Sequence, residues 1–218
     1  MLKAVIFDFD GMILDTEAIW FDIYQAWFKK NFKYDLPIEE FLWCVGANSD
    51  RLFDYLESER NIKVDRVQFA KDTFDDFLAG SKTLPARAGI EALIIETKEL
   101  GLQLALATSA SLEKPTFHLT RLALIDYFDV IVTSDDVENI KPHPDLFLEA
   151  LRQLKVEPNE AVVFEDSKSG LEAANKANIP TIVIPNNVTK YSEFIGYHKK
   201  IQSGLDITIK ELFEETQQ

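Results

Sequence analysis

Residues 4–11, AVIFDFDG, are the stretch of this sequence on which the predicted fold depends. The first four form a short apolar run, which is typical of a strand that is buried on both faces of a parallel sheet. Two carboxylates and a glycine follow at the carboxyl end of that run, where open α/β sheets place their ligands. The alternative is a strand that simply runs into an Asp-Gly turn.

Asp8 and Asp10 are two residues apart, so on an extended strand both would point to the same side. Two anions this close repel each other, and one pKa rises unless a cation lies between them. The simplest interpretation is a site for a divalent metal ion that includes a nucleophilic carboxylate.

The composition is that of a globular protein with excess negative charge. Of the 218 residues, 46% are hydrophobic and 28% are charged, and the formal net charge is −14. Because nucleic acids require basic surface, we expect no nucleic-acid partner. A single cysteine, Cys44, excludes an intrachain disulfide and favours a reducing compartment. With no signal peptide and no apolar run of the roughly 18 residues that span a bilayer, we expect a cytoplasmic protein without a membrane partner.

The region after the first strand has helical periodicity. From Glu17 to about Phe32, apolar residues recur at three- and four-residue spacings, which predicts an amphipathic helix that begins near Thr16. Three more helical patterns follow, over residues 38–44, 49–60 and 65–80. No strand pattern interrupts them, so we predict an inserted helical cap domain over 16–81.

From residue 85 onward, helices and strands alternate. Apolar segments predict strands at 102–107, 130–132, 161–164 and 181–184. Helices are predicted at 88–100, 112–122, 144–154, 168–177 and 209–214. With the first strand, this makes five strands separated by helices, the pattern of an α/β fold with a doubly wound parallel sheet. We assign this catalytic core to residues 1–15 and 82–218.

Polar residues follow the predicted strands, whose carboxyl ends meet at one edge of a parallel sheet. They are Asp8 and Asp10, then Thr108 and Ser109, then Lys141, and finally Glu165 and Asp166. Carboxylates suit Mg²⁺, which binds a few of them and keeps several waters. Hydroxyl and ammonium donors suit the oxygens of a phosphoryl group.

Each of these groups also has a simpler interpretation when taken alone. Thr108 and Ser109 could cap the next helix. Lys141 could be a solvated charge on a loop, and Glu165 with Asp166 could form an acidic helix N-terminus. Phosphoryl chemistry is favoured because all of them fall at one edge in complementary roles.

Four motifs follow one another along the chain: DFDG at 8–11, Thr108 after an apolar strand, KPHPD at 141–145, and FEDS at 164–167 with Gly170. In order and spacing they resemble the haloacid dehalogenase superfamily of phosphohydrolases, over the whole chain. The helical cap directly after the first motif resembles the branch that contains β-phosphoglucomutase and phosphatases of small metabolites.

The resemblance implies a role for each matching residue. Asp8 would attack phosphorus and form an aspartyl phosphate. Asp10 would protonate the leaving oxygen and then activate water. The phosphate-binding residues would be Gly11, Thr108, Ser109 and Lys141.

The resemblance also implies a metal ion and a moving cap. Mg²⁺ would be held by Asp8, the backbone carbonyl of Asp10, and Asp166, with Glu165 as a direct or water-bridged ligand. The cap would close over the site and select the substrate. Gly46 resembles the loop by which such caps reach the active site.

These features together imply a Mg²⁺-dependent phosphatase of a small phosphorylated metabolite such as a sugar phosphate, acting as a monomer or weak dimer. The alternative is a phosphosugar mutase of the β-phosphoglucomutase type. That subfamily has a histidine and an arginine where this chain has Trp20 and Ser49, which disfavours the mutase. We expect Trp20 to border the substrate instead. A dehalogenase would need neither Asp10 nor a metal, and a receiver-type signalling domain would lack the cap.

Overall fold

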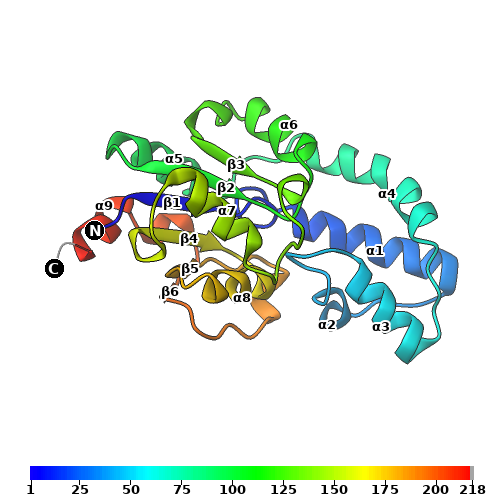
Figure 1. Cartoon of the computed structure of the whole chain (residues 1–218). Helices are drawn as coiled ribbons and strands as arrows, with labels where there is room; N and C mark the ends of the chain where they lie inside the picture. The colour runs from blue at the N-terminus through cyan, green and yellow to red at the C-terminus, as the bar shows by residue number, and fades with distance from the viewer. Residues whose placement is uncertain (217–218) are drawn as a thin grey trace.

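A six-stranded parallel sheet forms the centre of the core in the computed structural model, which describes residues 1–216 (Figure 1). Its strands are β1 (Ala4–Phe7), β2 (Gln103–Ala107), β3 (Val130–Val132), β4 (Ala161–Glu165), β5 (Thr181–Val183) and β6 (Lys199–Lys200). Their spatial order is β3-β2-β1-β4-β5-β6. The predicted parallel sheet is confirmed, but the predicted number of five strands is wrong, because β6 consists of two lysines without any apolar pattern.

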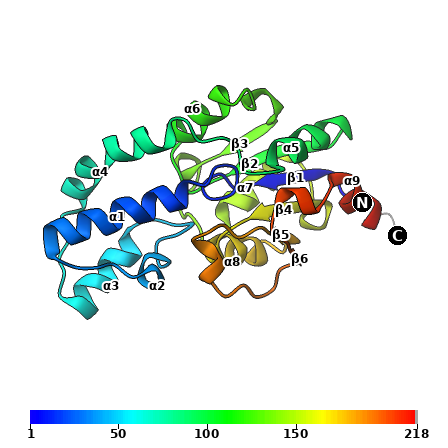
Figure 2. The same cartoon turned by 180° about the vertical axis from the view of Figure 1, so that it is seen from behind.

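Helices cover both faces of the sheet (Figures 1 and 2). One face carries α5 (Ile90–Glu99), α6 (Glu113–Arg121) and α9 (Ile209–Glu215), and the other carries α7 (Asp145–Leu154) and α8 (Lys168–Lys176). Val5 and Phe7 pack toward the first set, and Ala4 and Ile6 toward the second. All four residues of β1 are buried, as a continuous apolar run on a doubly covered strand requires.

The helical insert lies between β1 and α5, beside the core (Figure 1). It consists of α1 (Thr16–Phe32), α2 (Ile38–Phe41), α3 (Asp50–Arg60) and α4 (Arg66–Ser81). Its buried side chains form a cluster rich in aromatic residues, to which the core adds only Val188 among the described residues, and in which the rings of Tyr24 and Phe69 meet edge to face at 4.7 Å. Because this cluster is distinct from those around the sheet, we propose that residues 16–81 form a cap domain and that the core comprises 1–15 and 82–218, of which residues 217 and 218 lie outside the described part of the chain.

Most predicted helix boundaries differ from the structure by one or two residues, and the largest difference is at the end of α2. The helix expected over 38–44 ends at Phe41 and continues as turns toward Gly46, whose φ of +73° is in the left-handed region. The helix expected from residue 144 begins at Asp145, with Pro144 as its N-cap. Short 3-10 helices occupy Ile125–Tyr127, Ser134–Asp136, Pro158–Glu160, Thr189–Tyr191 and Gly204–Asp206.

The described chain begins and ends on the side of the core that is remote from the cap (Figures 1 and 2). There the backbone N–H of Leu2 donates to Oγ1 of Thr216 at 3.0 Å. Within residues 1–216, every helix is too short or too polar to cross a lipid bilayer.

Candidate active site

Strand register brings Asp8 and Glu165 to the same edge of the sheet. Phe7, the last residue of β1, pairs with Phe164 of β4, so the residues that follow this pair lie level with each other. The N–H of Asp8 donates to the carbonyl of Phe164 at 3.0 Å. Because β1 ends at Phe7, Asp8 and Asp10 lie on the loop that follows, and not on one extended strand as expected.

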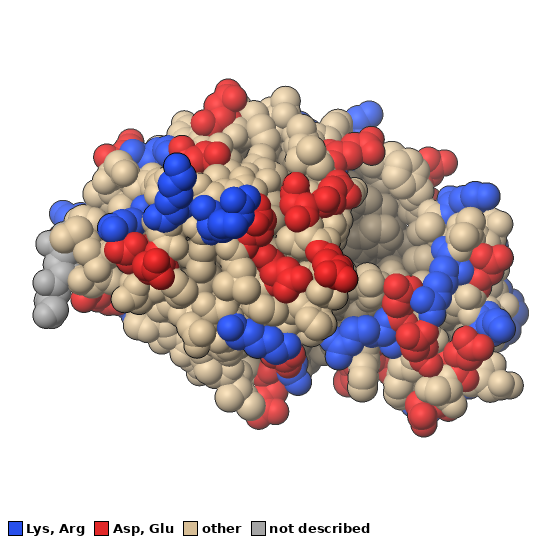
Figure 3. All heavy atoms as spheres, in the orientation of Figure 1, with Lys and Arg blue, Asp and Glu red and all other residues tan. Residues whose placement is uncertain are grey.

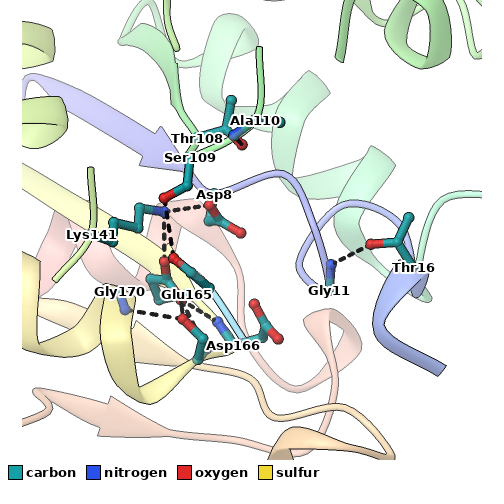
Figure 4. A network of polar contacts seen from close by, with 12 residues as sticks. Asp8, Gly11, Thr16, Thr108, Ser109, Ala110, Lys141, Glu165, Asp166 and Gly170 are labelled. Atoms are coloured by element: carbon teal, nitrogen blue, oxygen red, sulfur yellow. Dashed lines mark hydrogen bonds and ion pairs between the residues drawn. The ribbon is translucent and has the colours of Figure 1, made fainter. Parts of the chain in front are cut away.

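Lys141 lies between the two acids and is almost completely buried (Figure 4). Its ammonium donates to Asp8 and, at 2.7 Å, to Glu165. Burial disfavours the charge of Lys141, but the two carboxylates outweigh burial and raise its pKa. The interpretation of Lys141 as a solvated loop charge is therefore wrong, and the residue is a permanent cation between two acids.

Glu165 uses its two oxygens differently. Oε1 accepts from Lys141, and Oε2 accepts from the N–H groups of Asp166 (2.9 Å) and Ser167 (2.8 Å) at the start of α8. Gly170 is required beneath it, because a Cβ there would lie 1.7 Å from Oε1. Glu165 is therefore both the helix-start acid of the simpler interpretation and a partner of the lysine.

Asp166 completes a buried group of three carboxylates with Asp8 and Glu165, one oxygen from each lying within 4.8 Å of the others. Its Oδ2 accepts from Asn186 at 2.8 Å, while its Oδ1 is buried without a hydrogen-bond partner in residues 1–216. Burial raises the pKa of Asp166 well above its usual value, and the charges of Glu165 and Asp8 add to the increase. An unpartnered buried oxygen among three acids fits a divalent cation bound through oxygen ligands.

The pKa of Asp8 reflects the same excess of negative charge. Burial raises it to about 7, Lys141 opposes the increase, and Glu165 adds to it. A divalent cation would offset the excess and lower the pKa, which would keep Asp8 in the anionic form that a nucleophile requires.

Asp10 is not one of these three acids, and its carboxyl is held from two sides. Oγ1 of Thr16 donates to its Oδ1 at 2.7 Å and accepts from the N–H of Gly11 at 3.2 Å. The ammonium of Lys114 lies 2.6 Å from the same Oδ1. Thr16 and Lys114 were not predicted as site residues. The position of Lys114, in the first turn of the helix after Thr108, is the one signal that could have indicated it.

Gly11 supports the acidic group from the loop after β1. Its φ is +75°, and a Cβ there would lie 2.3 Å from Oδ2 of Asp166, so glycine is required for the close approach. Its carbonyl accepts from Arg87 and, at 3.3 Å, from Asn186. No motif in the sequence pointed to Arg87 or Asn186. That Gly11 binds phosphate stays a prediction.

Thr108 and Ser109 lie at the end of β2 and face the cap. Thr108 is buried, and Oγ of Ser109 donates to the carbonyl of Gly46 at 3.1 Å. A Cβ on Gly46 would lie 2.2 Å from Oγ of Ser167, so the cap loop fits closely against the core. The N-cap of α6 is Leu112, which means that Thr108 and Ser109 do not cap this helix.

A cavity of about 440 Å³ lies between the core and the cap, and Figure 3 shows its opening as a hollow with acidic side chains along part of its rim. The core contributes Asp8, Asp10, Thr108, Ser109 and Lys114 to its wall. The cap contributes Glu17, Trp20, Tyr24, Phe41, Phe53 and Phe69. Trp20 therefore lines this cavity, and that it borders the substrate stays a prediction.

Glu17 is the buried acid of the cap wall, although the sequence suggested only a helix-start role. It is 6% exposed and makes no side-chain hydrogen bond with the described residues. Burial raises the pKa of Glu17 to about 8, Asp10 adds to the increase, and Lys114 opposes it. The cavity therefore contains a free acceptor beside Asp10.

We expect Glu17→Gln to stabilise the metal-free protein in alkaline solution. The usual pKa of the carboxyl is 4.5 and its folded value is about 8, so its ionisation destabilises the fold increasingly as pH rises through this window. The neutral amide removes that cost. Thermal unfolding in EDTA should give the variant a higher Tm than wild type at about pH 9 and nearly the same Tm at about pH 4. The exposed Glu99→Gln serves as the control, and a lower Tm for Glu17→Gln at alkaline pH would contradict the expectation.

Three features together define a class of hydrolase: the parallel core, the helical insert after β1, and the buried acids at the carboxyl ends of β1 and β4. The chain belongs to the haloacid dehalogenase-like hydrolase family, whose family model matches residues 5–184. This confirms the resemblance inferred from the motifs.

Individual relatives match almost the full length. The YhcW protein of Bacillus subtilis is 36% identical over 215 residues, 98% of this chain and 97% of that protein. A phosphorylated carbohydrates phosphatase of Thermotoga maritima is 36% identical over 184 residues, 83% of this chain and 84% of that protein. Among solved structures, a CbbY variant from Rhodobacter sphaeroides in complex with xylulose-(1,5)bisphosphate is 29% identical, covers 94% of this chain and 95% of its own, and has a TM-score of 0.76.

Proposed function

We propose that this protein is a Mg²⁺-dependent phosphatase that hydrolyses a small phosphorylated metabolite of the sugar-phosphate class through an aspartyl phosphate on Asp8. The observation that carries the proposal is the position of Asp8, which belongs both to the buried acidic group and to the wall of the cavity. The ammonium of Lys141 donates to Asp8, and Asp10 lines the same cavity as Asp8. The names of the Thermotoga and Rhodobacter relatives support the substrate class.

The first step transfers the phosphoryl group to the protein. A carboxylate oxygen of Asp8 forms a bond to phosphorus while the bond to the leaving oxygen breaks, and that oxygen takes a proton from Asp10. Lys141 offsets the charge on Asp8 and on the phosphoryl oxygens, to which Thr108 donates a hydrogen bond. Ser109 can donate as well only when its hydroxyl releases the carbonyl of Gly46.

The second step returns the protein to its starting state. Asp10, now a carboxylate, takes a proton from water, and the water oxygen forms a bond to phosphorus. The bond to the Asp8 oxygen breaks, which releases inorganic phosphate and regenerates both carboxyl groups. Closure of the cap keeps other water away from the aspartyl phosphate.

The residues that would hold Mg²⁺ are the buried carboxylates of Asp8, Glu165 and Asp166, together with the backbone carbonyl of Asp10. When bound there, Mg²⁺ supplies positive charge to the phosphoryl oxygens. The protein itself orients the carboxylates that would bind the metal ion: Asn186 donates to Asp166, and the N–H of Asp166 at the start of α8 donates to Glu165.

The cavity wall favours a monophosphate with hydroxyl groups. Glu17 can accept hydrogen bonds from hydroxyls, and the aromatic rings of the cap suit the apolar faces of a sugar. Within cap residues 16–81, the cation of the cavity wall is Arg66, which is half exposed and paired with Asp50 and Asp54. A second phosphate deep in the cap would therefore lack a positive partner.

The lack of a positive partner for a second phosphate in the cap also disfavours the mutase. A mutase must hold a phosphorylated intermediate by both ends, and this chain has Ser49 where the subfamily has arginine. The hydroxyl of Ser49 is hydrogen-bonded to that of Tyr24 at 2.6 Å, and Trp20 stacks on Phe77 with ring centroids 4.1 Å apart. Neither residue supplies a charge to the substrate.

A panel of phosphate esters tests the proposed function. Phosphate release with Mg²⁺ would be measured on glucose 6-phosphate, sorbitol 6-phosphate, fructose 1-phosphate, β-glucose 1-phosphate, fructose 1,6-bisphosphate, AMP and p-nitrophenyl phosphate. We expect sugar or polyol monophosphates to be hydrolysed, with kcat/KM for the bisphosphate lower by about tenfold or more because its second phosphate would lack a positive partner in the cap. β-Glucose 1-phosphate should yield free glucose. Its conversion to glucose 6-phosphate would support the mutase, and no release from any ester would refute the proposal.

A further inference from the structure

Lys114 connects the candidate acid with the cap. It lies on the core helix α6, and its ammonium lies 2.6 Å from Oδ1 of Asp10. The same ammonium lies 4.6 Å from the ring centroid of Phe77 on α4 and 5.8 Å from that of Trp20 on α1. One side chain therefore contacts Asp10 and both long helices of the cap.

The two aromatic rings limit where this ammonium can lie. Trp20 and Phe77 are stacked face to face, with an interplanar angle of 9° and ring centroids 4.1 Å apart, and we call this pair the aromatic wall. A cation over the face of an aromatic ring, within about 6 Å of its centroid, is attracted by the ring electrons, and the Lys114 ammonium lies over both rings. The side chain of Lys114 is only 21% exposed, which limits the hydration of its ammonium by solvent.

We propose that Lys114 is a positioning residue that holds the Asp10 carboxyl toward the leaving oxygen when the aromatic wall of Trp20 and Phe77 packs against it. Thr16 holds the same oxygen from the cap side, so the core and the cap must meet for both contacts to form. The proposal rests on the proposed phosphatase function, because it assumes that Asp10 transfers the proton. Lys114 remains an ammonium throughout and exchanges no proton with the substrate.

Substrates with different leaving groups test this role. The p-nitrophenolate ion leaves without a proton at neutral pH, whereas the alkoxide of a sugar or polyol requires one. The ratio kcat/KM covers the steps up to release of the leaving group, so it isolates proton donation from the later hydrolysis of the aspartyl phosphate.

Lys114→Met keeps the length of the side chain and removes the charge. For the sugar or polyol phosphate of the panel that wild type hydrolyses fastest, we expect kcat/KM to fall about 100-fold, the usual contribution of a positioned general acid. For p-nitrophenyl phosphate we expect a fall of no more than about threefold. Lys114→Arg should recover most of the loss on the sugar phosphate, because it restores a cation beside Asp10.

Two further variants separate positioning from stability. Phe77→Leu removes half of the aromatic wall and should show the same selective loss on the sugar phosphate, to a smaller degree. Lys155→Met removes an exposed lysine after α7 and should match wild type on both substrates. Thermal unfolding of each variant with Mg²⁺ reports whether it is folded.

Equal losses on the two substrates that arise from a higher KM would overturn the proposal and make Lys114 a substrate-binding cation. Unchanged kinetics in Lys114→Met would overturn it as well. If that variant does not fold, an absence of selective loss in Phe77→Leu has the same consequence. Failure of wild type to hydrolyse any ester would instead refute the proposed phosphatase, which keeps the two proposals distinguishable.

Discussion

Asp8→Asn should abolish phosphate release from every ester that the wild type hydrolyses. An amide oxygen is a poor nucleophile, and loss of an activated nucleophile lowers kcat by about 10⁴-fold or more in enzymes that depend on one. The substitution preserves the shape of the side chain, and Lys141 keeps Glu165 as a partner at 2.7 Å. Steady-state phosphate release and mass spectrometry of acid-quenched enzyme would measure activity and the aspartyl phosphate.

The matched control is Asp126→Asn, which removes an exposed carboxyl on a surface 3-10 helix. It should retain wild-type kinetics and form the same phosphorylated enzyme. Thermal unfolding in EDTA should show that Asp8→Asn is folded. Appreciable turnover in a folded Asp8→Asn variant, or a phosphoryl group found on a residue other than Asp8, would contradict the assigned nucleophile.

Removal of Mg²⁺ should have the second largest effect. In EDTA the three buried carboxylates face one ammonium, and we expect turnover to fall by about 10³-fold, in line with several kcal/mol of charge stabilisation from a bound metal ion. Addition of excess Mg²⁺ should restore it. Full activity in EDTA would exclude a metal-dependent mechanism.

A second readout tests metal binding without activity. Because a ligand that binds only the folded state stabilises it, Mg²⁺ should raise the Tm of wild type. Asp166→Asn removes the carboxylate whose Oδ1 has no partner in the described structure, so the increase should be much smaller in this variant. An equal increase in both proteins would remove Asp166 from the metal site.

The sequence predicted the core well because its strands are covered on both faces. Such strands read as continuous apolar runs, as in β1 and β4, and turn residues mark the intervening helices. The edge strand β6 escaped because backbone hydrogen bonds alone define it: His198 donates to Thr181 at 2.8 Å, and Ile201 donates to Val183 at 3.0 Å. Backbone pairing leaves no pattern in the side chains.

The sequence likewise predicted one part of the candidate site and not the other. Asp8, Glu165 and Asp166 could be brought together in advance, because parallel strands in register end at one edge of the sheet. The burial of Lys141 between two of them could not, since a lysine in a loop is usually solvated.

The order of apolar and polar segments along the chain was enough to specify an α/β core, a helical insert and an acidic edge, because these depend on local periodicity and on the uniform direction of parallel strands. Packing of the cap on the core decided the rest: the cavity, the buried Glu17, and the contacts of Lys114 with Asp10 and the aromatic wall. These contacts join segments that are remote in sequence. Which side chains meet across such an interface depends on how the helices lie in space, and no short stretch of sequence contains that information.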